Sequence, residues 1–389
     1  MKYWRGYLTA AILAAITWAI KAFAESHRAI VDMVYPYASR LVQTTLADWT
    51  AGMDFCLWQV LAVLLIAALL TSIVLVILFR WNVFQWLGWV LTGASLLWLL
   101  HTGLYGLNYY AGPLADDIRM DTTGFSVTGL INATVYYRDQ ANALSQEIPR
   151  EEDGSAIFPD FDTLANAAGD GYETLTYDRS YSVFAGSSAP VKKLGWADLY
   201  SSMSIAGVTI PFTGEAAVNP NSPAISLPFT MCHEMAHRMC IAAEEDANFA
   251  AYLACTANED LTFRYSGYFM AFRYCYTALS SIGTSTADNA AKEIFTGIND
   301  TLKQDLQDYN AQLSAFYNKS ASDAATAVND AYLKASGEET GVDSYGDVCN
   351  LLVSWYVQEI YLPEHQDEEV GFDPLDKSQV DLGESASGN

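Results

Sequence analysis

Long runs of apolar residues without charge occupy the first quarter of the chain. Residues 55–79 and 83–107 contain no Asp, Glu, Lys or Arg, and residues 7–24 contain only Lys21. A helix needs about 20 apolar residues to cross a bilayer. The pattern therefore predicts three transmembrane helices. A cleaved signal peptide is the alternative for the first one, because residues 22–24 resemble a small-x-small cleavage site.

The apolar positions that follow these segments recur at helical spacing. They predict a helix across 126–148, one amphipathic helix across 288–309 and a further helix across 348–360. The clearest strand candidate is 208–212, and the proline inside it restricts this strand to a sheet edge. The soluble part is therefore expected to be mainly α, with a small β component.

Charge divides the chain into two parts that suit different solvents. The 389 residues carry a net charge of −25, although 51% of them are hydrophobic. Residues 1–110 have a net charge of +2, and the remaining residues have −27. We therefore predict a membrane anchor over 1–110, a soluble domain over 111–362 and an acidic disordered tail over 363–389. The negative charge of the soluble domain argues against a nucleic-acid partner, because it would repel phosphate.

Basic residues predict how the anchor lies in the membrane. Lys2 and Arg5 precede the first apolar segment, and Arg80 lies between the second and the third. Cytoplasmic loops carry an excess of Lys and Arg, so these residues are expected on the cytoplasmic side. The sequence thus predicts a multi-pass protein of the cell membrane, with the lipid bilayer as a partner and the C-terminal domain extracytoplasmic. It leaves the oligomeric state open.

Cysteine usage does not predict a disulfide framework. One of the six cysteines, Cys56, lies in an apolar segment, and five follow it. An odd number of cysteines in an exported domain, without a C-x-x-C pair, favours buried free thiols. One or two disulfides are the alternative.

A metal-binding motif, HExxH, occupies residues 233–237. Positions i and i+4 of a helix share one face, so His233 and His237 can converge on one metal ion. Neutral imidazole is a good ligand for zinc. Glu234 lies beside them, where a carboxylate can take a proton from water at the metal. The motif predicts a Zn²⁺ cofactor and a hydrolytic site; the alternative is an amphipathic helix with two polar histidines.

A catalytic zinc site needs a third protein ligand, and the nearest carboxylates lie seven or more residues after the motif. In a continuous helix, Glu244 would lie about 10 Å along the axis from His237, too far to share a metal ion. The chain must therefore turn between 238 and 243. No Gly or Pro occurs there, so Cys240 would have to adopt the irregular backbone of the turn.

Three carboxylates, Glu244, Glu245 and Asp246, begin the segment after this turn. We expect Glu244 to be the third ligand, with Asp246 as the alternative, although its shorter side chain needs a closer backbone. Asn248 lies one helical turn after Glu244 and is expected to hydrogen-bond a ligand imidazole. The carboxylates could otherwise be solvated residues of a first helical turn, where negative charge suits the helix dipole.

Several motifs in order resemble a known bacterial family. Residues 211–219, 227–237 and 244–255 are similar to a family of membrane-anchored proteins that are regarded as zinc metallopeptidases but catalogued only as a domain of unknown function. Residues 108–110 and 264–268 fit this family as well. HExxH followed by Glu is also similar to the gluzincin class of zinc peptidases.

This resemblance implies a zincin-like, helix-rich extracytoplasmic domain. Both histidines of the motif would be ligands, Glu234 would be the base, and a carboxylate from 244–246 would be the third ligand. The chain departs from the family pattern at two positions, since the family has Gly in place of Cys240 and Glu in place of Asp246. The second departure favours Glu244 as the ligand.

The expected activity is zinc-dependent hydrolysis of a peptide or protein substrate outside the membrane. Zinc activates water and polarises the scissile carbonyl, and Glu234 transfers the proton to the leaving amine. Tyr265, Tyr268 and Arg273 are candidates for stabilising the oxyanion. An edge strand commonly lies along the cleft in zincin folds, and residues 208–219 are expected to pair there with extended substrate.

Three other functions are alternatives. A catalytically inactive zincin-like binding or scaffold protein of the cell envelope would explain Cys240. An intramembrane protease would need the motif inside an apolar span, whereas Arg238 and residues 244–246 place charges beside it. A structural membrane protein with an acidic domain would leave the HExxH spacing unexplained.

Overall fold

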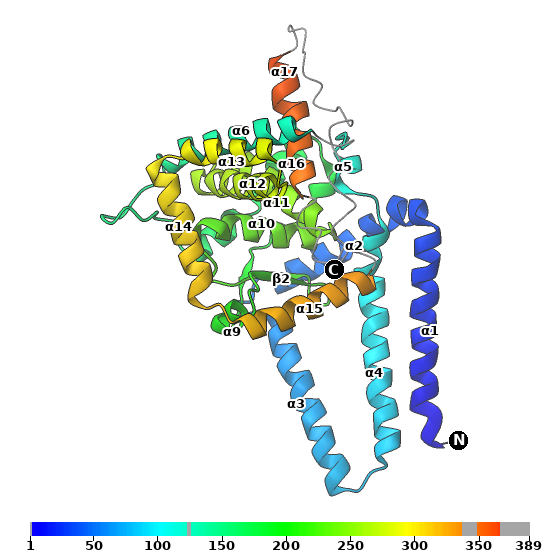
Figure 1. Cartoon of the computed structure of the whole chain (residues 1–389). Helices are drawn as coiled ribbons and strands as arrows, with labels where there is room; N and C mark the ends of the chain where they lie inside the picture. Colours follow the sequence, from blue (N-terminus) through cyan, green and yellow to red (C-terminus); the bar gives the residue numbers. More distant parts are fainter. Residues whose placement is uncertain (1, 123–125, 337–347, 366–389) are drawn as a thin grey trace.

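The computed structural model describes residues 2–122, 126–336 and 348–365, and it is mainly helical (Figure 1). Long helices extend from one side of a helical domain that contains a small sheet. The N-terminal elements are η1 (Lys2–Trp4), α1 (Arg5–Ser26), α2 (Arg28–Thr50), α3 (Leu57–Leu78), α4 (Val83–Leu104) and η2 (Gly106–Tyr110). The helices of the domain are α5 (Leu114–Asp117), α6 (Val127–Ser145), α7 (Phe161–Ala167), α8 (Asp170–Asp178), η3 (Ser182–Phe184), α9 (Ala197–Ser202), η4 (Ala224–Ser226), α10 (Leu227–Arg238), α11 (Glu244–Ala257), α12 (Leu261–Ser281), α13 (Ser285–Thr296), α14 (Asp300–Ala315), α15 (Lys319–Ser336), α16 (Val348–Tyr356), the π-helical η6 (Val357–Tyr361) and α17 (Leu362–Glu364).

The three apolar segments predicted from the sequence are helices α1, α3 and α4, each of 22 residues. At 1.5 Å per residue each helix measures about 33 Å. All three are therefore long and apolar enough to cross a membrane. Helix α3 leads away from the domain, a short turn follows, and α4 leads back to the same side of the domain (Figure 1).

Helix α1 packs along α4 through small residues. A Cβ atom on Gly6 would lie 2.6 Å from the carbonyl carbon of Gly88, and Thr92 Oγ1 donates to the carbonyl oxygen of Gly6 at 2.8 Å. Small residues allow helix backbones to approach this closely inside a bilayer. A cleaved first segment would lose these contacts.

Residues 28–50 form α2, an element that the apolar pattern does not predict. Its buried face carries polar side chains that bind backbone atoms of other segments. Ser39 Oγ donates to the carbonyl oxygen of Leu104 at 2.7 Å, and Arg40 Nε donates to that of Met239 at 3.0 Å. Helix α2 therefore joins the end of α4 to the domain, although it lies within the part of the sequence assigned to the anchor.

A single apolar core fills the domain and extends from Leu114 to Val357, almost the whole predicted span of 111–362. Aromatic side chains without solvent exposure, such as Tyr137, Phe249 and Phe269, contribute most to its volume. Burial of each such side chain stabilises the fold by about 2 to 3 kcal/mol relative to exposure. Of the helices that contribute them, α11 and α12 pack on α10, which carries the HExxH motif, and α6 packs on α12.

The predicted helices agree with the structure except at one place. The single helix expected across 288–309 is two helices, α13 and α14, because Gly297 follows the first and Asn299 caps the second. The Oδ1 atom of Asn299 accepts from the backbone N–H of Leu302 at 2.7 Å. The apolar positions Ile294, Ile298 and Leu302 are all buried, so their period continues across the break. Of the predicted tail, residues 366–389 lie outside the described residues.

The sheet contains β1 (Lys192–Lys193), β2 (Gly207–Ile210) and β3 (Glu215–Val218) in the order β1-β3-β2. Strand β3 runs parallel to β1 and antiparallel to β2, with Gly207 opposite Val218 and Ile210 opposite Glu215. The edge strand predicted over 208–212 is confirmed as β2, but of the segment 208–219 expected to pair with substrate, residues 215–218 form the central strand β3. Strand β2 ends before Pro211, which cannot donate a ladder hydrogen bond.

All six cysteines are buried free thiols, as the sequence favours. Two pairs nevertheless lie close together. The sulfur atoms of Cys232 and Cys255 are 3.7 Å apart, and those of Cys275 and Cys349 are 3.8 Å apart. The alternative of one or two disulfides is not realised in this structure.

Candidate metal centre

Helix α10 places the two histidines of the motif on one face. It begins with Leu227 and Pro228, and proline suits the first turn because the N–H groups there have no intrahelical acceptor. The Nε2 atoms of His233 and His237 lie 3.0 Å apart, with the rings almost perpendicular. Most other side chains of this helix are buried in the core, which fixes its rotation. The i, i+4 convergence predicted from the sequence is confirmed.

The turn after α10 is made by Cys240 in the left-handed conformation, with φ of 71°. The N–H of Cys240 donates to the carbonyl of His237 at 2.9 Å, and the N–H of Ile241 donates to that of Ala236 at 3.1 Å. This pair of bonds is a Schellman motif, in which glycine is the usual left-handed residue. The predicted turn is therefore confirmed, with the irregular backbone at Cys240. The buried Cys240 thiol lies 3.2 Å from Ser39 Oγ on α2.

Glu244, the first residue of α11, returns to the histidines after this turn. Its Oε2 atom is 3.4 Å from His233 Nε2, and its Oε1 atom is 3.7 Å from His237 Nε2. Ligand atoms in a tetrahedral zinc site with bonds of 2.0–2.1 Å are about 3.3 Å apart. The three observed separations of 3.0, 3.4 and 3.7 Å bracket that value. Among the described residues, these three side chains form the group with metal-ligand spacing.

Electrostatics also favour a cation between these groups. Burial lowers the pKa of His237, but the hydrogen bond and charge of Glu244 outweigh burial and raise it to about 9. Burial raises the pKa of Glu244, but hydrogen bonds from both histidines outweigh it and hold that pKa well below the usual range. Without a metal, the site therefore retains a proton between histidine and carboxylate. A metal cation would satisfy the same carboxylate in place of that proton.

Glu234 is buried between α10 and the edge strand. Thr209 Oγ1 of β2 lies 2.8 Å from Glu234 Oε2 and 2.8 Å from the backbone carbonyl of the same residue. Burial raises the pKa of Glu234, and the neighbouring histidines partly offset this effect. A carboxylate with a raised pKa, next to two histidines with metal-ligand spacing, has the properties of a general base.

The alternative ligand and the predicted imidazole partner have other roles. Asp246 Oδ2 accepts from the backbone N–H of Leu114 at 2.9 Å, and this carboxylate is not part of the group with metal-ligand spacing. Asn248 Oδ1 accepts from the hydroxyl of Tyr274 at 3.2 Å. The predicted hydrogen bond from Asn248 to a ligand imidazole is wrong for this structure, because His233 Nδ1 is buried without a partner and His237 Nδ1 binds the carbonyl of Ile241.

The three predicted oxyanion residues have partners on elements other than α10. All of them lie on α12, where the hydroxyl of Tyr265 donates to Asp305 of α14, the ring of Tyr268 packs against Tyr136 of α6, and the guanidinium of Arg273 lies 4.0 Å from the ring centre of Tyr309. The prediction is corrected for each, because helical rotation turns these side chains toward α6 and α14 instead of the histidines. Proximity in sequence was a poor guide to their position.

Three tyrosines that the sequence did not assign to the site lie beside the cluster. Tyr105 follows α4 directly and packs against Cys240 and Ala242, with 4% of its surface exposed. The Tyr109 ring lies 6.3 Å from that of Tyr105 and 6.3 Å from that of Tyr332 on α15. Burial raises the pKa of Tyr105 well above its usual value, and the charges of the nearby carboxylates act in the same direction.

The signal that could have indicated Tyr105 and Tyr109 was weak. Tyr105 lies near the end of the third apolar segment, 83–107, where tyrosine is common at a membrane surface, and Tyr109 lies just after it, within the 108–110 stretch that fits the resembled family. Nothing in their spacing connects them to a motif more than a hundred residues later. Their place beside the histidines depends on how α4 and η2 pack on the turn at Cys240.

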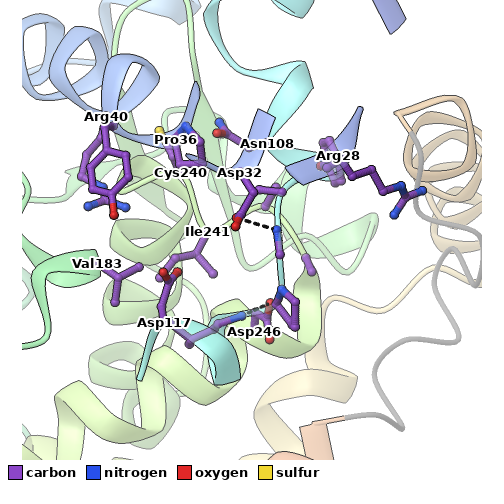
Figure 2. A pocket seen from close by; sticks show the side chains of 18 of the residues that line it. Arg28, Asp32, Pro36, Arg40, Asn108, Asp117, Val183, Cys240, Ile241 and Asp246 are labelled. Atoms are coloured by element: carbon purple, nitrogen blue, oxygen red, sulfur yellow. Dashed lines mark hydrogen bonds between the residues drawn. The ribbon is translucent and has the colours of Figure 1, made fainter. Parts of the chain in front are cut away.

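A cavity of about 400 Å³ lies beside this centre, between α2 and the turn that follows α10 (Figure 2). Its lining includes Arg28, Asp32, Asp117, Cys240 and Asp246, but neither histidine of the motif. Two backbone N–H groups in its wall bind carboxylates, as the dashed lines of Figure 2 show. The cavity is therefore a neighbour of the metal-ligand group and does not contain it.

Comparison with known proteins identifies a family but no named relative. No curated protein and no solved structure matched the chain. A family model described as "Protein of unknown function (DUF3810)" matches residues 31–353, which include α3, α4, the sheet and the HExxH helix. The match covers more than four fifths of the sequence, so this chain belongs to the DUF3810 family of proteins of unknown function.

Proposed function

We propose that this protein is a membrane-anchored zinc metallopeptidase of the His₂Glu type. The observation that carries the proposal is the convergence of His233, His237 and Glu244 at separations of 3.0 to 3.7 Å from two different helices. Two histidines and a carboxylate are the ligand set of thermolysin-like catalytic zinc sites. The orientation of His237 by the carbonyl of Ile241 adds the outer hydrogen bond that such ligands normally have.

The residues around this centre support hydrolysis of a peptide bond. A zinc ion held by the three ligands would lower the pKa of water and polarise the scissile carbonyl. Glu234 would accept a proton from the attacking water and deliver it to the leaving amine. The Tyr105 hydroxyl, kept protonated by its raised pKa, is our candidate for hydrogen bonding to the developing oxyanion.

The edge strand supplies a place for an extended substrate. The outer edge of β2 has no strand partner among the described residues, and Thr209 of this strand contacts Glu234. An extended peptide that added to this edge would therefore pass beside the general base. Main-chain pairing of this kind binds a peptide with little dependence on its sequence, which suits a peptide or protein substrate.

The anchor and the site together suggest where hydrolysis takes place. Helices α1, α3 and α4 are long and apolar enough to span a bilayer. The basic residues Lys2, Arg5 and Arg80 lie at the ends that face away from the domain, which favours a cytoplasmic position for those ends. The proposal therefore places the metal centre on the extracytoplasmic side of the cell membrane.

The alternative of an inactive scaffold rested on Cys240. In the structure this residue takes the left-handed conformation of the turn while the three ligand side chains still converge. No observation in the described part of the chain therefore favours the scaffold over the enzyme.

The test uses the full-length protein in detergent micelles, with Glu234→Gln as the matched variant. We expect about one zinc ion per chain in both proteins, measured by inductively coupled plasma mass spectrometry. Cleavage of a random peptide library, read by mass spectrometry, should fall at least a hundredfold in the variant, because general bases contribute about 10² to 10⁴ in rate. Wild-type protein without zinc, or equal cleavage by both proteins, would contradict the proposal.

A further inference from the structure

The metal centre lies at the level where the apolar helices end. Helix α4 ends at Leu104, and the next residue, Tyr105, already packs against the turn that connects the HExxH helix to Glu244. The residue directly after a candidate membrane span is therefore part of the wall of the site. Extended backbone covers at most about 3.6 Å per residue, so this link cannot lift the site away from the end of α4.

Helix α3, a second candidate span, is attached to the sheet whose edge strand β2 we propose to bind substrate. The backbone N–H groups of Leu57 and Trp58, in the first turn of α3, donate to the two carboxylate oxygens of Glu215, each at 2.8 Å. Glu215 lies on β3 opposite Ile210 of the edge strand, and it also pairs with Lys192 at 2.7 Å. A buried carboxylate at a helix N-terminus binds strongly, so Glu215 joins the first turn of α3 to the sheet.

The side chain of Gln43 contacts both the end of α4 and the residue after the edge strand β2. The Nε2 atom of Gln43 lies 3.4 Å from the carbonyl oxygen of Leu104 and 3.2 Å from that of Pro211, the residue that follows the edge strand. Gln43 has no solvent exposure. The ring of Phe212, next in the chain, lies 6.3 Å from that of His101 in the last turn of α4. The edge strand thus ends beside the end of a candidate span.

Exposed apolar residues lie near the domain-side ends of α3 and α4, as on a surface that faces a membrane. Helix α15 crosses beneath β2, between the domain-side ends of α3 and α4 (Figure 1). Its positions 324, 328, 331 and 335 share one stripe, are Ala or Val, and are exposed, with Val328 at 72%. Phe55, just before α3, is also exposed, at 52%. Exposed apolar helix faces and aromatic residues at the ends of spans are typical of the lipid–water interface.

The geometry points to a substrate class: polypeptides anchored in the same membrane, cut within the first few residues that leave the bilayer. This inference rests on the proposed peptidase activity and adds the position of the bond to it. A chain emerging from the bilayer would reach the edge of β2 in extended form, because that edge lies at the bilayer surface. A segment far from the membrane would have to fold back toward the surface to reach the same edge.

The test compares identical cleavage segments at increasing distances from one anchor. The substrate has an N-terminal transmembrane helix, followed by four copies of a decapeptide that the protein cuts in free solution, separated by Gly/Ser linkers of about 30 residues. Full-length protein and substrate are reconstituted together in phosphatidylcholine vesicles. The control is the same four-copy chain without its anchor, and Glu234→Gln protein controls for contaminating proteases.

We expect the copy nearest the anchor to be cut at least ten times more often than the most distant copy. The chain without an anchor should be cut evenly, because its copies are equivalent in solution. Even cutting of the anchored chain that is abolished by Glu234→Gln would overturn the membrane-proximal inference and leave the peptidase proposal standing. No cutting of either chain by the wild-type protein would overturn both.

Discussion

The Nδ1 atom of His237 lies 2.8 Å from the carbonyl oxygen of Ile241, four residues later in the chain. A carbonyl oxygen only accepts hydrogen bonds, so Nδ1 must carry the proton, and Nε2 is the ring atom directed at Glu244. Ile241 belongs to the turn that reverses the chain between α10 and α11. One turn therefore has two effects: it returns Glu244 to the histidines, and it orients the ring of His237.

The choice between the two candidate carboxylates can be tested directly. Glu244→Gln should lose zinc on dialysis, because the variant removes the charge that contacts both histidines. Asp246→Asn, the matched control, should keep about one zinc ion per chain. It should unfold more easily by about 1 kcal/mol, since an amide oxygen can still accept from the buried N–H of Leu114 but lacks the charge of the carboxylate. Zinc content and thermal unfolding are the measurements. Zinc lost by Asp246→Asn and kept by Glu244→Gln would reverse the assignment.

The contact between the edge strand and the base predicts a second effect. A Cβ atom on Gly207 would lie 2.5 Å from Glu234 Oε1, closer than atoms can approach, so Gly207→Ala should displace this carboxylate. We expect kcat to fall at least tenfold while zinc content stays unchanged, because Gly207 touches the base and not the ligands. Gly52→Ala is the control, since a Cβ there meets nothing within 4 Å. Equal activity of both variants would show that Glu234 does not need its observed position.

The assignment of Tyr105 to the oxyanion is testable against a tyrosine that the structure places elsewhere. Tyr105→Phe should keep zinc and lower kcat by about a hundredfold, which is typical when one oxyanion donor is removed. Tyr265→Phe removes a buried hydroxyl that donates to Asp305, so it should lower the melting temperature and leave kcat nearly unchanged. Steady-state kinetics on one cleaved peptide measures both. If Tyr265→Phe has the larger effect on kcat, the assignment is wrong.

Backbone strain at Cys240 can be separated from the packing of its side chain. Both Cys240→Ala and Cys240→Gly lose the thiol. Alanine has a Cβ atom and is strained at the positive φ of this position, whereas glycine is not. Left-handed backbone at a residue other than glycine costs about 1 to 3 kcal/mol. We therefore expect the Gly variant to melt a few degrees above the Ala variant in the same detergent. A lower melting temperature for the Gly variant would mean that the turn is not strained.

Much of the candidate site could be predicted because its pattern is local. The i, i+4 spacing of His233 and His237 needs only a helix, and the distance from His237 to Glu244 along a helix axis requires a turn between them. The edge position of β2 followed from one proline. Each of these predictions depends on residues within a dozen positions of one another, where chain geometry alone restricts the outcome.

Other features depend on contacts between distant segments, and the sequence pattern could not supply them. Asp246 looked equivalent to Glu244 in sequence, but the N–H of Leu114, 132 positions earlier, binds its carboxylate. Tyr265 was close to the motif along the chain, but rotation of α12 turns it toward Asp305. Tyr105 joins the site through packing across 135 positions, against Cys240.

The sequence by itself determined the apolar helices, the convergence of the two HExxH histidines and the need for a chain reversal, because hydrophobic length, helical period and rise per residue act locally. Only the tertiary structure decided which carboxylate meets the histidines and which tyrosines surround them. It also decided that the centre lies at the ends of the candidate spans. The physical reason is that these outcomes are set by buried hydrogen bonds between backbone groups of other segments and three side chains: Gln43, which donates, and Glu215 and Asp246, which accept. Their partners are ordinary backbone groups, which carry no signature in the sequence.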